Sequence, residues 1–157
     1  MRRLVAMMAL GVTVFTMSGC EGRGRNTQTA NVSNPRAVHC TITADGPKRD
    51  AEPPKTIVGR VRFRCDNPGA EALTLTVRLQ KRSGSTWQTV ASQTVTVKGE
   101  DTHAQFFKYR TREVKVACAA GKFRTTVDWT KLSHGKTAKG SSRSGTAIDP
   151  CAPRIFS

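Results

Sequence analysis

Apolar and polar residues alternate in run after run of this 157-residue chain, and that alternation constrains the fold more than any other feature. Successive side chains of an extended strand point to opposite faces of a sheet, so a period of two predicts a strand with one buried face. The clearest run is residues 57–65. It places Val61, Phe63 and Cys65 on one face and Arg60, Arg62 and Arg64 on the other.

Seven such segments follow one another at short, fairly even spacing: residues 37–43, 57–65, 72–81, 87–97, 104–109, 112–118 and 122–130. A series of strands without helices predicts an all-β fold, a single immunoglobulin-like or fibronectin-like antiparallel β-sandwich of about seven strands. Two features of true immunoglobulin domains are missing: a Trp in the strand after Cys65, and a Tyr two residues before Cys118, where Val116 stands. The prediction therefore concerns the architecture and not the family.

Polar segments flank the predicted sandwich, residues 36–130. Residues 20–35 are rich in Asn, Thr, Gly and Arg, and we expect them to be a flexible tether because they cannot bury a core. Residues 131–157 are predicted to be a polar tail that Cys151 pins back onto the sandwich, with residues 131–149 flexible and exposed. Within the sandwich, residues 45–55 are predicted to form a loop, because they contain Gly46 and three prolines.

The first 19 residues have the organisation of an export signal. Arg2 and Arg3 precede the uncharged residues 4–17. That stretch suits a signal core and is shorter than the roughly 20 residues of a membrane-spanning helix. Ser18 and Gly19 are small, as a signal cleavage site requires, and Cys20 follows at once. We therefore predict that residues 1–19 are a signal peptide.

The four residues Met17-Ser18-Gly19-Cys20 resemble the lipobox of bacterial lipoprotein precursors, with Met17 where that family usually has leucine. The resemblance implies that a diacylglycerol is attached to the Cys20 thiol and that the chain is cut just before it. Two acyl chains hold a protein stably on a bilayer, whereas one binds only reversibly. The protein would then be anchored to the outer face of a bacterial cell membrane. An ordinary secretory signal is the alternative.

Four cysteines remain beyond Cys20, an even number in a chain predicted to be exported: Cys40, Cys65, Cys118 and Cys151. That pattern predicts two disulfides. Pairing near neighbours joins Cys40 to Cys65 and Cys118 to Cys151; pairing as in immunoglobulin domains joins Cys65 to Cys118 and Cys40 to Cys151. We expect no metal site, because no two cysteines have the spacing of a zinc site.

The chain is strongly basic. Its net charge is +15, and loss of Arg2 and Arg3 with the signal leaves 15 − 2 = +13. Such a charge attracts polyanions, among them anionic lipid heads, cell-wall polymers and acidic proteins. Nucleic acid is not expected as a partner, because little of it lies outside the membrane and the chain has no recognised binding motif. A merely soluble basic surface is the alternative.

Catalytic patterns are absent from the sequence. Ser85 and Ser92 lack a nucleophile-elbow motif, and the glycines form no phosphate-binding loop. Asp101 and His103 lie close together, but such a pair is more often part of a solvated loop. We predict a protein that is not an enzyme and that uses no cofactor.

Two groups of side chains suggest binding. Arg60, Arg62 and Arg64 would project about 7 Å apart from one strand face, twice the rise per residue. The alternative is a solvated face or an edge strand protected by charge. The second group mixes aromatic and cationic residues, which suits stacking and anion contacts: Phe106, Lys108, Tyr109, Arg110 and Arg112. Alternatively, Phe107 and Tyr109 pack inward. Trp87 and Trp129 are predicted to lie in the core.

The leading hypothesis is a lipid-anchored, non-catalytic protein of the envelope surface that binds a protein or polyanionic partner. One alternative is a lipoprotein encoded by a phage or prophage that acts in superinfection exclusion, an analogy of size and build. Another is a basic structural protein associated with the cell wall without a specific partner. Added salt distinguishes a structural protein without a specific partner from a protein with one, because screening weakens non-specific charge attraction.

Overall fold

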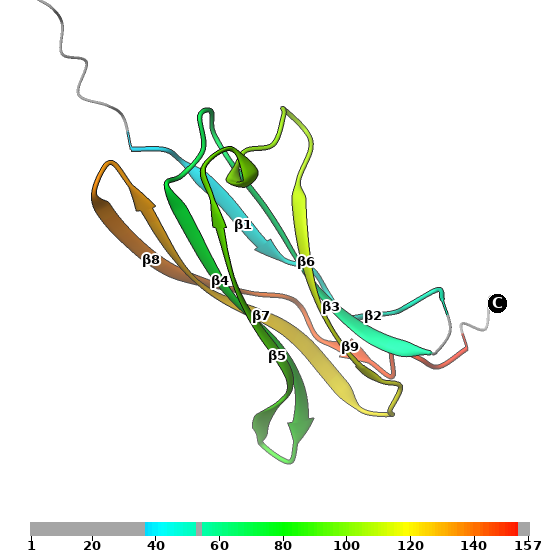
Figure 1. Ribbon diagram of the computed structural model, residues 1–157. Helices are drawn as coiled ribbons and strands as arrows, with labels where there is room; N and C mark the ends of the chain where they lie inside the picture. The colour runs from blue at the N-terminus through cyan, green and yellow to red at the C-terminus, as the bar shows by residue number, and fades with distance from the viewer. Residues whose placement is uncertain (1–36, 53–54, 154–157) are drawn as a thin grey trace, which may run out of the picture. The chain divides into compact units, whose positions relative to one another are not determined.

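The computed structural model describes residues 37–52 and 55–153 (Figure 1). The predicted signal peptide, Cys20 and the predicted tether lie outside these residues. The described residues fold into two antiparallel sheets. Strand β3 (Thr56–Cys65) is central in the first sheet, and pairs with β6 (Arg110–Ala117) along one side and with β1 (Cys40–Ala44) and β2 (Lys48–Arg49) along the other.

The second sheet has the order β5–β4–β7–β8. Its strands are β4 (Ala72–Ser83), β5 (Thr86–Lys98), β7 (Lys122–Ser133), β8 (Lys136–Arg143) and the short β9 (Ala147–Ile148), which also pairs with β7. A single turn of 3₁₀ helix, η1 (Gly99–Thr102), links β5 to the segment before β6. Nowhere in the described part of the chain is there a helix of the length and hydropathy needed to cross a membrane.

The predicted all-β sandwich is confirmed. Among the described strands, seven have five residues or more: β1 and β3 to β8. In chain order, the first, second and fifth of these share one sheet, and the third, sixth and seventh share the other. Immunoglobulin-like sandwiches have the same division. In constant-type immunoglobulin domains the fourth strand belongs to the same sheet as the first and second. Here the fourth long strand, β5, pairs with the third instead.

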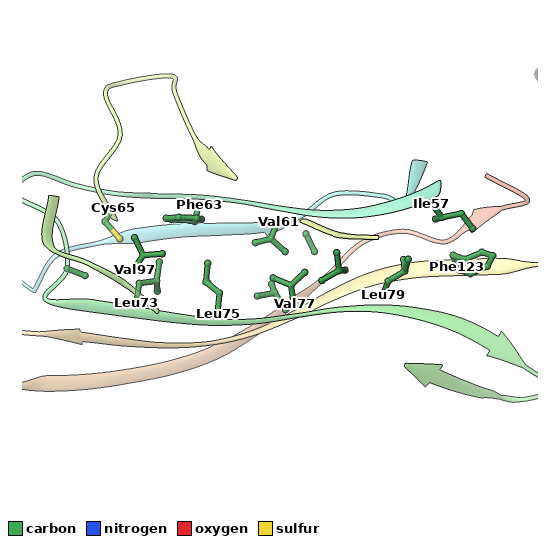
Figure 2. Packing of buried hydrophobic residues seen from close by; sticks show 14 of the residues in the cluster. Ile57, Val61, Phe63, Cys65, Leu73, Leu75, Val77, Leu79, Val97 and Phe123 are labelled. Carbon is green, nitrogen blue, oxygen red and sulfur yellow. The ribbon is translucent and has the colours of Figure 1, made fainter. Parts of the chain in front are cut away.

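The core lies between the two sheets (Figure 2). The inward residues of β4 are Leu73, Leu75, Val77 and Leu79, as the alternation predicts, and each is at most 1% exposed. They face Val61 and Phe63 of β3, which are fully buried. Burying one such side chain contributes about 1.5–3 kcal/mol, so this row fixes which face of each strand points inward.

One predicted strand is wrong. Residues 104–109 are not a strand; they form a loop with a turn in which Lys108 N donates to Gln105 O at 2.9 Å. Phe107 has a φ of 67°, in the left-handed region, and a strand cannot continue through that conformation. The alternating aromatic and polar side chains of this segment imitate a strand in sequence alone. Strand β6 begins at Arg110, after the turn.

The predicted flexible tail is also wrong between Lys131 and Asp149. Strand β7 extends to Ser133, and a tight turn at His134 and Gly135 leads into β8. Both turn residues have positive φ, 51° and 67°, as a two-residue hairpin turn requires. Strand β8 is mostly exposed and nearly devoid of large apolar residues, so its polar composition concealed it. Residues 45–55, predicted to be a loop, contain β2.

Both disulfides join near neighbours in sequence, Cys40 to Cys65 and Cys118 to Cys151. Cys40 and Cys65 are directly opposite each other on β1 and β3, with their Cα atoms 4.0 Å apart. The immunoglobulin-type pairing of Cys65 with Cys118 is wrong. Cys118 N bonds to Lys55 O, at the far end of β3 from Cys65. Ten residues of strand span about 30 Å, far beyond the reach of a disulfide.

Candidate binding surface

Two groups of residues that are distant in sequence meet at one end of the sandwich. Strand β3 ends at Cys65, β6 begins at Arg110, and the register places Phe63 opposite Arg110. A bridge between Cys65 and His103 brings residues 103–109 to the same place. The predicted arginine row of β3 and the predicted aromatic segment are therefore neighbours, which the sequence did not indicate.

The arginine row points outward as predicted, but its members differ in their partners. Arg60 Nε donates to Glu113 Oε1 at 2.6 Å, and Arg62 Nη2 lies 2.8 Å from Asp45 Oδ1. Arg64 has no ion pair with any described residue. Two of the three charges are thus balanced within the protein, and the row is not a ladder of three free cations.

Arg62 and Arg64 lie against aromatic rings of the loop. The guanidinium carbons of Arg62 and Arg64 are 5.4 and 5.3 Å from the centre of the Tyr109 ring, and that of Arg64 is 5.7 Å from the centre of the Phe106 ring. These are cation–π distances. We call the group formed by Arg62, Arg64, Phe106, Phe107 and Tyr109 the aromatic–cation surface.

The two phenylalanines of this surface face solvent. Phe106 is 76% exposed and Phe107 is 82% exposed, and their ring centres are 4.1 Å apart. Tyr109 is 38% exposed. The interpretation in which Phe107 and Tyr109 pack inward is therefore wrong, because the segment is a turn and not a strand that alternates into the core. A pair of exposed phenylalanines is typical of an interaction site in a folded domain.

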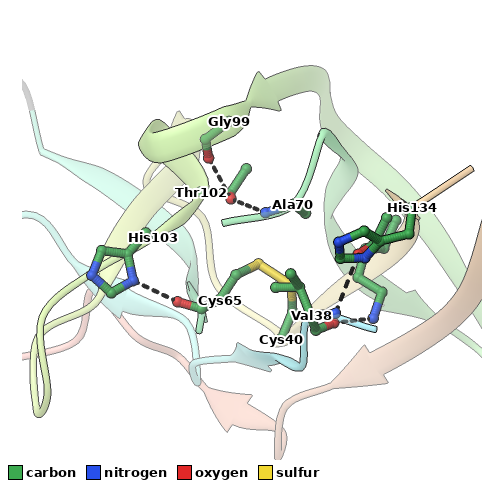
Figure 3. The surroundings of a disulfide bond; sticks show 10 residues. Val38, Cys40, Cys65, Ala70, Gly99, Thr102, His103 and His134 are labelled. Atoms are coloured by element: carbon green, nitrogen blue, oxygen red, sulfur yellow. Dashed lines mark hydrogen bonds between the residues drawn. A yellow bond between two sulfur atoms is a disulfide. The ribbon is translucent and has the colours of Figure 1, made fainter. Parts of the chain in front are cut away.

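The base of the loop is fixed to the strand ends (Figure 3). His103 Nδ1 lies 3.0 Å from Cys65 O, and Arg110 Nε donates to His103 O at 3.2 Å. Cys65 itself is fully buried and bonded to Cys40. Behind the loop, the buried Thr102 hydroxyl accepts from Ala70 N and donates to Gly99 O, each at 2.7 Å. The exposed rings thus stand on an ordered support.

A hollow of about 540 Å³ adjoins the loop. Its lining includes the cations Lys108 and Arg110, the carboxylate of Glu100, and the rings of His103 and Tyr109. Such a mixed lining can form hydrogen bonds of both polarities with a partner while the neighbouring phenylalanines supply apolar contact area. His103, the residue for which the sequence allowed a catalytic role beside Asp101, contributes its ring nitrogen to a backbone hydrogen bond instead.

Arg112, a predicted site residue, lies apart from this surface. It is opposite Val61, on the inward side of β6, with its guanidinium carbon 5.8 Å from the centre of the buried Phe63 ring. Its Nη1 donates to Thr111 O at 2.8 Å. Arg112 therefore caps the edge of the core, and the remaining cations of the predicted aromatic group, Lys108 and Arg110, are the ones that line the hollow.

Trp87 was predicted to be in the core, and that prediction is wrong, whereas Trp129 packs against the core as predicted. Trp87 is on the outer face of the second sheet, where the guanidinium carbon of Arg124 lies 4.2 Å from its ring centre. The cause is a shift of register in β5, which no sequence pattern marks.

No protein-family model matches the chain, and no curated protein or solved structure matches it either. Among residues 37–52 and 55–153, no three His, Cys, Asp or Glu side chains lie close enough to share a metal ion. Function is therefore inferred from the surfaces that the fold presents.

Proposed function

We propose that this is a non-catalytic binding protein of the bacterial envelope, held at the outer face of the cell membrane by lipid on Cys20, which binds a protein or polyanionic partner through the aromatic–cation surface. The observation that carries the proposal is the exposure of Phe106 and Phe107, at 76% and 82%, on a loop that is fixed at its base. The lipid anchor rests on the resemblance of residues 17–20 to a lipobox.

The energetics of recognition favour such a surface. Aromatic and arginine side chains dominate the binding energy of protein interfaces. Covering one phenylalanine ring contributes about 1.5–3 kcal/mol, and two rings that lie together offer a contiguous contact. Because His103 ties the base of the loop to Cys65, the backbone there loses less conformational entropy on binding than a free loop would.

The charges favour an acidic partner. Arg64 is not paired with a carboxylate among the described residues, and Lys108 and Arg110 line the adjacent hollow. Positive charges that are not balanced within the protein steer negatively charged partners to the surface. The net charge of +13 expected for the mature chain acts in the same direction.

The position of the surface suits a tethered protein. Residue Ala37, where the described chain begins, leads directly into β1, and the first pair of β1 is Cys40 with Cys65. The loop of Phe106 and Phe107 is at the same end of the sandwich (Figure 1). A partner bound there would be close to the point where the chain from Cys20 enters the domain.

The anchor is tested first. The full-length gene is expressed in a bacterial host, and the intact mass of the membrane-bound product is measured. We expect a chain that begins at Cys20 and carries a diacylglycerol. An unlipidated product released to the medium would overturn the anchored part of the proposal and leave the binding surface untouched.

The binding surface is tested by site-specific photocrosslinking in the same cells. A photoreactive residue replaces Phe107 in one variant and Ile148 in a matched control, because Ile148 is also a large exposed apolar residue, at 66%, in β9. We expect a discrete adduct from position 107 that survives high salt and disappears when Phe106→Ser is added. Identical adducts from both positions, or adducts that vanish with moderate salt, would favour non-specific attraction.

A further inference from the structure

The outer face of the second sheet changes character along its length. At one end, threonines of β4 and β5 pair across the strands, with hydroxyl oxygens of Thr74 and Thr96 2.9 Å apart and those of Thr76 and Thr94 3.1 Å apart. At the other end, this face carries arginines from three strands and one tryptophan: Arg78, Arg82, Arg124, Arg143 and Trp87. This cationic half is separate from the aromatic–cation surface, which is on the other sheet.

A β-bulge creates the aromatic part of this half. Leu79 is opposite Ala91, but the next residue of β4, Gln80, is opposite Thr89, so β5 holds one extra residue at Val90. Relative to the partner strand, one extra residue reverses which face the side chains on the far side of the bulge point to, here those before Val90. The bulge thus turns Trp87 to the outer face, opposite Arg82.

Trp87 and Gln80 hold Arg124 in place. The guanidinium carbon of Arg124 lies 4.2 Å from the centre of the Trp87 ring, and its Nε donates to Gln80 Oε1 at 2.8 Å. Neither partner supplies a negative charge. Burial lowers the pKa of Arg124, and the positive charge of Arg143 lowers it further. Arg124 and Arg143 line the same hollow, and no carboxylate of the described residues pairs with either.

A hollow of about 490 Å³ lies beside Gln80, Arg124 and Arg143. Arg78, Arg124 and Arg143 line it together with the hydroxyl-bearing Ser141 and Thr126. Asp128, its one carboxylate, is occupied by an ion pair with Arg78. The Thr126 hydroxyl is buried and has no hydrogen-bond partner among the described residues.

We propose that this hollow, lined by Arg78, Arg124 and Arg143, is a binding site for a phosphate-type oxyanion. The guanidinium fork matches the geometry of a phosphate and donates two parallel hydrogen bonds to it. An anion held here balances the charges of Arg124 and Arg143, and the hydroxyls of Ser141 and Ser142 in the lining supply further donors. The oxyanion has two sources with the same chemistry, free phosphate and the phosphodiester of an envelope polymer.

The site is tested with the protein produced from the full-length chain. Inorganic phosphate and a glycerol phosphodiester are titrated separately at constant ionic strength, with chloride as the reference anion. The readouts are Trp87 fluorescence, because Arg124 is stacked on that ring, and the backbone amide shifts of residues 126 and 141–143. We expect saturable binding. Tighter binding of the diester would identify an envelope polymer as the source of the oxyanion. Tighter binding of inorganic phosphate would identify the free ion as the source.

Two charge-neutralising variants decide whether the hollow is responsible. Arg143 lies on the exposed strand β8, and Arg143→Gln removes its guanidinium from the lining of the hollow. We expect this variant to bind the anion at least about tenfold more weakly. Lys139→Gln removes a charge from the same strand, and the residue opposite, Thr130, lies outside the hollow; we expect a change of less than about twofold. Equal losses in the two variants, or no saturable response to either anion, would overturn the proposal.

This inference does not depend on the proposed function. Substitution of both Phe106 and Phe107 by Ser removes the exposed rings from the loop before β6, a strand of the other sheet, and should leave anion binding unchanged within about twofold. The two proposals can therefore fail separately.

Discussion

Trp129 and Gly140 are opposite each other on β7 and β8, and the indole ring of Trp129 occupies the space where a side chain at residue 140 would stand. A Cβ added to Gly140 would come within 2.7 Å of Trp129 Cε2, which is closer than real contacts of this kind. The absence of a side chain at Gly140 lets the ring lie flat along β8 and close this edge of the core.

Gly140→Ala should therefore destabilise the protein. Forcing a methyl group into a filled site costs about 1–3 kcal/mol in the free energy of unfolding. Gly145→Ala is the matched control, because an added Cβ there meets nothing within 4 Å, and we expect a change within about 0.5 kcal/mol. Denaturant unfolding measures both. Equal effects would contradict the packing of Trp129 against β8.

The exposed phenylalanines should contribute little to stability. Replacing both Phe106 and Phe107 by Ser should change the free energy of unfolding by no more than about 0.5 kcal/mol, because neither ring is buried. Phe63→Ala, at a fully buried position of β3, should cost about 3–5 kcal/mol. A loss above about 1 kcal/mol in the double variant would indicate that the loop packs inward after all.

The two disulfides should have similar effects on stability and different effects on the loop. Their cysteines are 25 and 33 residues apart, for which loop closure predicts a contribution of about 3.5 kcal/mol each. Paired alanine substitutions at Cys40 and Cys65, or at Cys118 and Cys151, should lower stability by that amount. Only the first pair should speed amide exchange in residues 103–109, since His103 bonds to Cys65 O. Equal exchange in both variants would contradict the proposed support of the loop.

The ion pair between Asp50 and Lys115 should give a small, pH-dependent stabilisation. Lys115 Nζ lies 2.6 Å from Asp50 Oδ2, and this hydrogen bond lowers the pKa of Asp50 from its ordinary 3.8 and raises the pKa of Lys115 from 10.5. The contribution of Asp50 is present above pH 3.8 and is lost as the pH falls through the lowered pKa. That of Lys115 is present below pH 10.5 and is lost as the pH rises through the raised pKa.

Thermal unfolding across pH tests this pair. The midpoint of the wild-type protein should exceed that of Asp50→Asn near neutral pH, and the difference should shrink at both extremes. Asp66→Asn serves as the control, because Asp66 forms no ion pair with any described residue. A difference that persists well below pH 3.8 would show that Asp50 stabilises the fold in another way.

The core strands were predictable because burial imposes a visible pattern. β3 and β4 each have one face in the core, so alternation revealed their inward residues, and it placed their limits to within two residues. β8 is mostly exposed and carries no buried apolar row, so no alternation marked it, although its backbone pairs with β7 along eight residues. The one sign of that hairpin was the His134-Gly135 turn, whose glycine tolerates positive φ.

The candidate surfaces were predictable only in part. The outward direction of Arg60, Arg62 and Arg64 follows from the alternation of β3. Their contact with the aromatic loop depends on the turn at Phe107, because that turn decides where the rings point. Likewise, Trp87 stands on the outer face because of one additional residue in β5, and side-chain chemistry carries no record of such a shift.

The Cys40–Cys65 bond has a mechanical consequence. Two antiparallel strands that are pulled apart from one end lose one hydrogen bond after another. The residue pair at that end therefore bears the load first. Tension on the chain that precedes Ala37 enters the domain at the start of β1, where the first residue pair is Cys40 with Cys65. That pair is joined covalently. Once the hydrogen bond from Asp66 N to His39 O has opened, tension from that side would therefore meet a covalent cross-link before it reached the residue pairs of β1 with β3 that follow Cys40.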